Sequence, residues 1–186
     1  FPVVDSVSYK FETCILNFED AHFYWHPGFN PISIGKAFLA NILAGKTVRG
    51  GSTLTQQVIR LSRNHKKRTY WEKVRELVLA TRLELGYSKK YILKLYASHA
   101  PFGGNVVGLE AAAWRYFGMQ PNQLSWAEAA TLAVLPNAPS LIYPGKNHSK
   151  LLYKRNRLLH KLLDNNYIDS TTYRLSLLEE LPKKPF

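Results

Sequence analysis

The stretch that decides the fold class spans residues 125–136 and reads Ser-Trp-Ala-Glu-Ala-Ala-Thr-Leu-Ala-Val-Leu-Pro. Its first four residues form a capping box, in which the side chains of Ser125 and Glu128 accept hydrogen bonds from backbone N–H groups at a helix start. Pro136 cannot continue a helix, so we expect this one to run from Trp126 to Leu135. The residues in between are mostly Ala and Leu, which predicts a buried helix.

Similar helix start and stop signals recur along the chain and predict an all-α (mainly α) fold of short helices joined by Gly- and Pro-rich loops. Asn30 and Pro31 begin one helix, which Gly45 ends, and we expect Ser52 to cap the next. A helix from about Tyr70 to Leu85 is expected to turn Trp71, Val74 and Val78 inward and to stop at a left-handed Gly86. Further helices are predicted from Ser88, around Ala111–Ala113, at 151–163 and at 170–178, with an irregular loop at 101–104.

The composition describes a basic globular chain. It has 186 residues, a formal net charge of +12, 46% hydrophobic residues and a single cysteine, Cys14, which excludes an intramolecular disulfide. The length favours one domain. Between Arg60 and Lys94 there are 11 basic residues, so an anionic partner is expected: nucleic acid, anionic lipid and a pyrophosphate all qualify. The alternative is a solvated helical face.

The first candidate for chemistry is Glu19 with Asp20, followed by aromatic residues that include Phe23, then His26 and Gly28. A carboxylate near apolar rings has its charged form disfavoured, which raises its pKa toward the range useful for proton abstraction. The alternative is an acidic pair on the surface at a helix end. Metal binding by His22 and His26 is discounted, because Pro27 interrupts a helix there and no third ligand is evident.

The second candidate is the segment 49–57, Arg-Gly-Gly-Ser-Thr-Leu-Thr-Gln-Gln, in which a glycine pair leads into a helix start. Free backbone N–H groups and the helix dipole at such a start favour an anion such as phosphate. The Gly-Lys-Ser/Thr ending of a Walker loop is absent, so nucleotide hydrolysis is not indicated. A simple capped helix is the alternative.

The third candidate is Glu76, with Arg68 two turns and Lys73 one turn before it. Such spacing places cations beside a carboxylate. An exposed helix with weak surface ion pairs would give the same pattern.

Together these segments resemble the peptidoglycan glycosyltransferase family (glycosyltransferase family 51), found in monofunctional transglycosylases and class A penicillin-binding proteins. All five family motifs occur in order between Cys14 and about Tyr167. The motifs lie at 19–28, at 51–57, at 73–84, at 92–118 and at 124–144. The loop at 100–104 and the tail at 181–185 resemble the penicillin-binding protein 1C branch.

The resemblance implies that the chain polymerises lipid II into β-1,4-linked glycan strands, with inversion and release of undecaprenyl pyrophosphate. Glu19 would be the general base and Glu76 the second catalytic carboxylate. The substrate-binding residues carried over from the motifs are Asp20, Phe23, His26, Gly51, Ser52, Thr55, Gln56, Gln57, Arg60, Arg68, Lys73 and Arg75. A divalent cation, Mg²⁺ or Mn²⁺, is expected at the substrate pyrophosphate, with no organic cofactor and with any protein ligands unknown.

The family fold is a lysozyme-like large lobe with a small membrane-facing jaw lobe, in which the segment after Phe23 and the helix from Ile32 to Gly45 would touch lipid. The expected partners are lipid II, the growing lipid-linked strand, the membrane surface and cell-wall synthesis proteins, with no nucleic acid. The expected location is the outward face of a bacterial cytoplasmic membrane. Residues 1–180 would form the domain and 181–186 the start of a linker, with a membrane anchor before Phe1 and more chain after Phe186.

Several positions depart from the family pattern. Ala21 and His22 stand where a basic pair is common, Arg60 replaces a Lys, Leu61 and Ser98 stand where Asn is usual, and Glu72 stands where Arg is usual. The charge reversal at Glu72 bears most directly on the phosphate site. It keeps open a scaffold that binds lipid II without polymerising it. A glycan hydrolase of lysozyme-like shape is a further alternative, although it would have no use for the second motif or the arginines.

Overall fold

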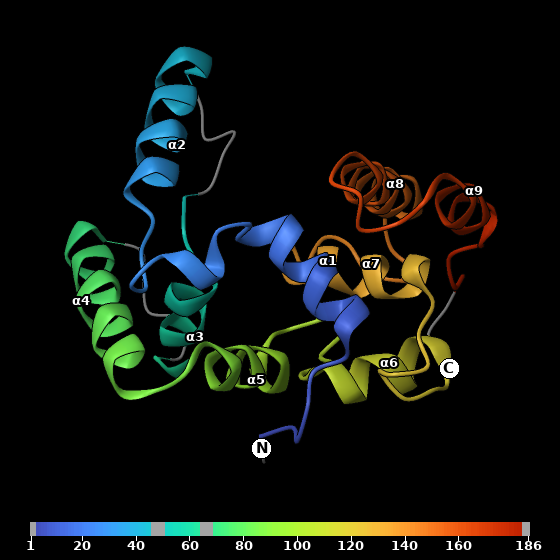
Figure 1. Cartoon of the computed structure of the whole chain (residues 1–186), viewed down its shortest axis with the longest axis horizontal. Helices are drawn as coiled ribbons and strands as arrows, with labels where there is room; N and C mark the ends of the chain where they lie inside the picture. The colour runs from blue at the N-terminus through green and yellow to red at the C-terminus, as the bar shows by residue number, and fades with distance from the viewer. Residues whose placement is uncertain (1–2, 46–50, 64–68, 184–186) are drawn as a thin grey trace. The chain divides into compact units, whose positions relative to one another are not determined.

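The computed structural model describes residues 3–45, 51–63 and 69–183 (Figure 1). Over these ranges the chain is all-α, as predicted, and the only β pairing is two isolated bridges, Pro101 with Val107 and Tyr143 with Lys146. None of the described helices is both long enough and apolar enough to cross a membrane. The chain divides into two compact units, Phe1–Ala21 with Ala97–Phe186, and His22–Tyr96.

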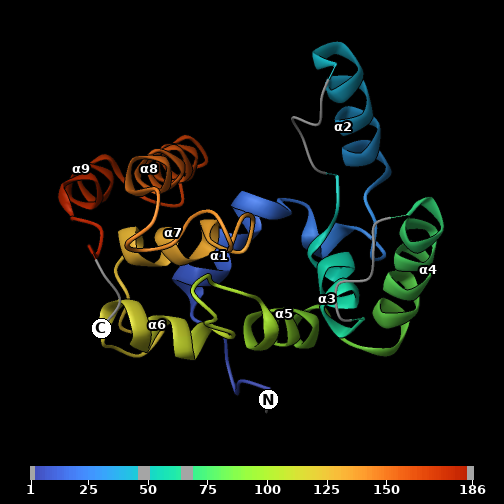
Figure 2. The same ribbon diagram turned by 180° about the vertical axis from the view of Figure 1, so that it is seen from behind.

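The first unit is built around α7 (Trp126–Val134), which packs against α1 (Tyr9–Glu19), α6 (Leu109–Phe117), α8 (His148–Asp164) and α9 (Ser170–Leu178). Figure 2 shows α7 beside α1 from behind. The capping box of Ser125 and Glu128 is present, and every residue from Ala127 to Val134 except half-buried Glu128 is buried. Both predictions for this stretch are therefore confirmed, with Leu135 as the C-terminal cap.

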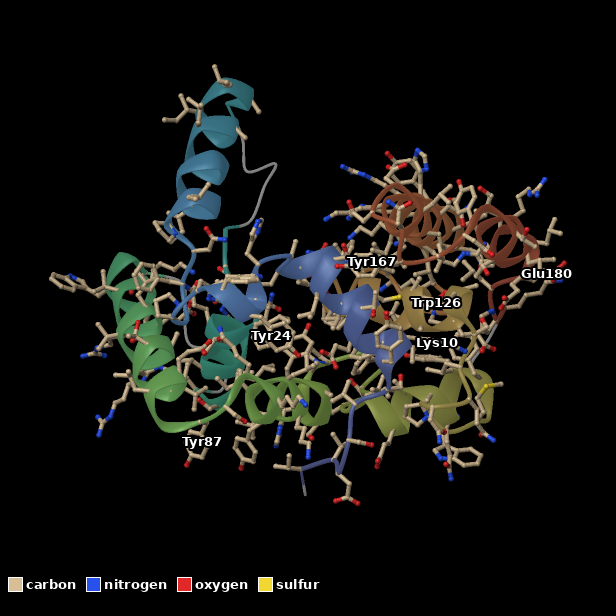
Figure 3. The ribbon with its side chains drawn as sticks, in the orientation of Figure 1. Lys10, Tyr24, Tyr87, Trp126, Tyr167 and Glu180 are labelled. Atoms are coloured by element: carbon tan, nitrogen blue, oxygen red, sulfur yellow. The ribbon has the colours of Figure 1, made fainter. Side chains whose placement is uncertain are left out.

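Contacts at the start of α7 fix the direction of α1. Lys10 donates from Nζ to the Leu124 carbonyl at 2.7 Å, and Tyr9 packs edge-on against Trp126 with ring centroids 6.1 Å apart. Figure 3 labels Lys10 and Trp126 at this junction. Since α1 runs from here to Glu19, these contacts set where the proposed base lies in the first unit.

The second unit contains η1 (Phe23–Trp25), α2 (Pro31–Ala44), α3 (Leu54–Ser62), α4 (Tyr70–Gly86) and most of α5 (Lys89–His99), whose last three residues belong to the first unit. Pro31 begins α2 and Gly45 ends it, as predicted, and Gly45 adopts the left-handed conformation. The predicted Ser52 cap is wrong. Thr53 caps α3 by accepting from Gln56 N–H, so Ser52 is left for other contacts.

The orientation predicted for α4 is also wrong. Trp71 is 78% exposed and Val78 63% exposed, and Val74 is exposed as well. Among the described residues of α4, Glu76 and Ala80 are the most buried, because α4 turns a carboxylate and a small residue toward α3 and the backbone around Gly28. Gly86 is a helical residue rather than a left-handed stop, and extended Tyr87 caps the helix.

Gly28 allows the chain after η1 to pass against α4. Its φ is +90°, and a Cβ placed on it would lie 2.7 Å from the carbonyl carbon and oxygen of Ala80. Its carbonyl accepts from Thr53 Oγ1 at 2.7 Å, and its N–H donates to His26 Nδ1 at 3.2 Å. Gly28 thereby connects the first motif to the start of the second.

We expect Gly28→Ala to lower the free energy of unfolding by more than about 2 kcal/mol, because the methyl group adds a backbone clash to a strained φ. Gly35→Ala, within α2, is the matched control, since a Cβ there meets nothing within 4 Å. This control should gain roughly 0.5–1 kcal/mol from helix propensity. Urea unfolding followed by circular dichroism measures both, and similar stabilities for the two variants would contradict the role given to Gly28.

Candidate active site

Glu76 is the centre of a charged cluster between α3 and α4. Arg60 donates to both of its carboxylate oxygens, from Nε to Oε1 at 2.9 Å and from Nη2 to Oε2 at 3.0 Å. Lys73, one turn earlier on α4, lies with Nζ 3.4 Å from Oε2. The bidentate geometry suits the planar guanidinium, so the Arg60 found here in place of a Lys forms a more directional pair.

Two polar residues complete this cluster. Lys73 Nζ donates to Ser52 Oγ at 2.7 Å and to Gln56 Oε1 at 2.8 Å, and Arg60 Nη2 donates to Ser52 Oγ at 3.3 Å. We call Ser52, Gln56, Arg60, Lys73 and Glu76 the cationic cluster. Its five members come from two family motifs and from Arg60, and the structure brings all five together. Gln56 Nε2 is buried and has no hydrogen-bond acceptor among the described residues.

The cluster keeps Glu76 ionised. Burial alone would raise the pKa of Glu76, but the hydrogen bond and charge of Arg60, followed by the charge and hydrogen bond of Lys73, outweigh it and lower the pKa below its usual 4.5. At neutral pH the group is therefore a carboxylate that orders two cations. It is not poised to donate a proton as a general acid.

A second, more buried set of contacts lies at the other end of α4. Glu84 Oε1 accepts from Lys89 Nζ at 2.8 Å and from Thr55 Oγ1 at 2.5 Å. Lys89 Nζ also donates to the His26 carbonyl at 2.6 Å and lies 4.6 Å from the centroid of the Phe23 ring. We call Glu84, Lys89 and Thr55 the buried hub.

The buried hub changes how three of the predicted substrate-binding residues are interpreted. Thr55 is fully buried, Phe23 is 1% exposed and His26 is 7% exposed. Their described contacts are with the protein, so they position the backbone of the first and second motifs. No role was predicted for Lys89, and Glu84 was predicted only as part of the third motif. The available signal was the spacing of Glu76, Ala80 and Glu84 at successive turns, which marks the buried face of α4.

Glu19 and Asp20 lie in the first unit, at the end of α1. Glu19 is the last helical residue, and Asp20 caps the helix with its N–H bonded to the Leu16 carbonyl at 2.9 Å. Asp20 is buried, and Oε1 of Glu19 is buried. A carboxylate oxygen removed from bulk water suits a group that accepts a proton.

The remaining predicted residues fall outside the cationic cluster. Arg75 is exposed and pairs with Glu72 at 3.2 Å, and Glu72 also binds Arg63 at 2.9 Å. Gly51, before α3, and Gln57, within it, are partly exposed. The predicted Arg68, together with Arg49 and Gly50, lies outside the described residues. The charge reversal at Glu72 is thus compensated by two neighbouring arginines.

We expect Glu76→Gln to lower the free energy of unfolding by about 1–3 kcal/mol at pH 7, because Arg60 and Lys73 lose a charged acceptor. Since the pKa of Glu76 is lowered in the folded state, its stabilisation is complete above about pH 4.5 and is lost as the pH falls through the folded-state pKa. The difference between parent and variant should therefore shrink in acid.

Urea unfolding at several pH values measures this difference. Glu72→Gln, on the same helix, is the control, and its cost should stay under about 1 kcal/mol because its partners are more exposed. A difference between Glu76→Gln and the parent that does not change between pH 7 and pH 3 would contradict the pKa shift.

Comparisons with known proteins agree with these motifs. A family model described as Transglycosylase matches residues 2–163. Penicillin-binding protein 1C of Escherichia coli is 43% identical over 163 residues, covering 87% of this chain and 21% of that protein. Penicillin-binding protein 1A of Aquifex aeolicus is 38% identical over 167 residues, covering 90% of this chain and 22% of that protein.

A crystal structure of penicillin-binding protein 1A from Haemophilus influenzae is also similar, with a TM-score of 0.46 and 26% identity over 69% of this chain and 16% of that chain. The chain spans about a fifth of the length of the two curated relatives above. Because the family model covers most of the sequence, the chain belongs to the transglycosylase family, the peptidoglycan glycosyltransferases also found in class A penicillin-binding proteins.

Proposed function

We propose that this domain polymerises lipid II into β-1,4-linked glycan strands, releasing undecaprenyl pyrophosphate. The observation that carries the proposal is the cationic cluster, in which Arg60 and Lys73 are ordered by Glu76. A departing pyrophosphate gains negative charge, and preorganised cations stabilise that charge without having to reorganise. Buried Gln56 Nε2 provides a further donor for an oxygen of the substrate.

In this reaction Glu19 accepts the proton of the 4-hydroxyl of the acceptor N-acetylglucosamine. The hydroxyl oxygen forms a bond to the anomeric carbon of the donor strand, and the bond from that carbon to the pyrophosphate oxygen breaks. Attack opposite to the leaving group inverts the α-linked donor to a β linkage. Glu76, ionised by its two cations, serves the leaving-group side through Arg60 and Lys73.

A divalent cation, Mg²⁺ or Mn²⁺, is proposed to act with the substrate's own pyrophosphate. Among the described residues no group of three or more His, Cys, Asp and Glu is placed to hold a metal ion. Pyrophosphate oxygens are hard ligands of the kind that Mg²⁺ prefers, so the substrate supplies the chemistry for binding. When bound, the cation would add positive charge where the leaving group departs.

The second unit has the surface that a lipid-linked substrate requires. Ile32, Leu39, Ile42 and Leu43 of α2 are exposed, and Trp25 of η1 is 87% exposed. Exposed apolar and aromatic side chains on a basic chain suit the interface of a membrane that contains anionic lipids. We therefore place the domain at the outward face of a bacterial cytoplasmic membrane, where the growing strand and other cell-wall synthesis proteins would be its partners.

We expect Glu19→Gln to abolish polymerisation, with at least a hundredfold loss of rate, because the amide cannot accept the proton. The assay incubates the chain with labelled lipid II, detergent and Mg²⁺ and resolves the products by length on a gel. Glu110→Gln, an exposed carboxylate of the first unit, is the control and should polymerise like the parent.

Lipid II binding is measured in parallel by fluorescence anisotropy and should be retained by Glu19→Gln. Polymer formed by Glu19→Gln at the parent rate would exclude Glu19 as the base. Binding without polymer in the parent chain would favour a scaffold that binds lipid II without polymerising it. The presence of Glu72, where the family usually has Arg, leaves that alternative open.

A further inference from the structure

The last turn of α1 contains a buried polar residue, Asn17, to which neither the motifs nor the proposed reaction assigns a role. Asn17 is 5% exposed and lies two residues before Glu19. Its side-chain Nδ2 donates to the Thr13 carbonyl one turn earlier at 2.9 Å. Burying an amide is unfavourable unless its polar atoms are paired, so the partners of its other polar atoms matter.

Those partners come from the C-terminal end of α8. Lys161 Nζ donates to the main-chain carbonyl of Asn17 at 2.5 Å, and Asn165 Nδ2 donates to Asn17 Oδ1 at 3.1 Å. Asn165 is the C-terminal cap of α8, where its own N–H bonds to the Lys161 and Leu163 carbonyls. Tyr167, two residues further on, marks the chain just beyond α8 in Figure 3. We call Asn17, Lys161 and Asn165 the Asn17 network.

The network satisfies a helix end that α1 does not satisfy by itself. The last carbonyls of a helix have no partner within it. In α1 the Leu16 carbonyl accepts from the Asp20 N–H, and the Asn17 carbonyl accepts from Lys161. The last turn of α1 contains no basic residue, although Glu19 and Asp20 place carboxylates at the negative end of the helix dipole. Lys161 therefore brings to this end a positive charge that the helix itself lacks.

Binding at both the backbone and the side chain of Asn17 limits the movement of this turn. Helix ends fray when their last carbonyls are bonded only to water. Glu19 is the last residue of α1, so any unwinding of the turn changes the direction in which its carboxylate points. A reacting group has to stay within about 0.5 Å of its productive position, and small displacements are costly in rate.

We propose that Lys161 and Asn165 are positioning residues for the general base, which bind Asn17 from α8 and thereby hold the turn that carries Glu19. The inference rests on the proposed function of Glu19. The action on Glu19 passes through the backbone of α1, since Asn17 is the residue that both side chains bind. The alternative is a purely structural role, in which the same contacts only hold α8 against α1.

The test uses matched variants of α8. Lys161→Met removes the ammonium group and keeps an unbranched side chain, Lys161→Arg restores a cationic donor, and Asn165→Ala removes the second contact. Arg157→Met, at an exposed position one turn before Lys161, is the control for the loss of one positive charge. Thermal melts followed by circular dichroism establish whether each variant is folded at the assay temperature.

The first readout is amide hydrogen exchange by ¹H–¹⁵N NMR, which reports on local opening of the helix. In Lys161→Met the amides of residues 18–20 should exchange at least about fivefold faster than in the parent, because the turn loses a bond to α8. Amides of α7 should exchange at the parent rate. Asn165→Ala should show the same local increase, and Lys161→Arg and Arg157→Met should match the parent.

The second readout is the rate of lipid II polymerisation. Lys161→Met should lower kcat roughly three- to tenfold and leave KM within about twofold of the parent value, because the base is less often in its productive position while the cationic cluster is untouched. Lys161→Arg should restore most of kcat. A purely structural role predicts instead a lower melting temperature with a parent kcat in the folded variant.

Unchanged exchange at residues 18–20 in folded Lys161→Met would overturn the inference. So would a parent kcat, or an equal rise in exchange throughout the first unit, since both indicate a purely structural role. Failure of the proposed function looks different, because the parent would then make no polymer or Glu19→Gln would polymerise at the parent rate. The exchange measurement decides in either case whether the Asn17 network orders the last turn of α1.

Discussion

The ion pair between Glu84 and Lys89 is the contact on which the second unit depends. The Glu84 side chain is 7% exposed and that of Lys89 19%, with 2.8 Å between Oε1 and Nζ. Through this pair α4 and α5 are connected to Thr55 at the start of α3 and to the His26 carbonyl after η1. Loss of one partner from a buried pair leaves an uncompensated charge and typically costs about 3–5 kcal/mol. The polar contacts of this pair therefore add to apolar burial in holding the loops between these elements.

The cationic cluster follows from this arrangement. Once the start of α3 is bonded to the far end of α4, the two helices pack along their length and Arg60 is brought against Glu76. Gly28 contributes by letting the backbone pass within contact of Ala80. Two of the segments that resemble family motifs thus support the structure as well as containing candidate substrate-binding residues. This accounts for the burial of Phe23, His26 and Thr55.

Much of the fold could be predicted from local signals. The capping box at Ser125, the proline at the start of α2 and the left-handed Gly45 act within a few residues, so the sequence alone specifies them. The orientation of α4 could not be predicted in this way, because apolar residues usually mark the buried face and here Trp71 and Val78 are exposed. The buried face instead carries carboxylates, whose burial depends on cations from other elements.

The sequence also predicted part of the candidate site, as it did part of the fold. Spacing on one helix predicted the pairing of Lys73 with Glu76, and the family resemblance predicted that Ser52 and Gln56 belong with them. The bidentate pairing of Arg60 with Glu76 joins two helices, and only the fold reveals it.

The amide of Gln56 has a consequence for the evolution of this domain. Its Nε2 is fully buried without an acceptor among the described residues, and an unsatisfied buried donor costs about 1–3 kcal/mol. Gln56 Oε1 accepts from Lys73 Nζ at 2.8 Å, so a side chain that kept this acceptor without the donor would remove that cost, and selection for thermal stability alone would eliminate the amide. Its retention would then reflect a trade-off in which resting stability is sacrificed for a donor that finds its acceptor only when substrate is bound. Variants selected solely for heat resistance would be expected to change this position early and to lose turnover as they do so.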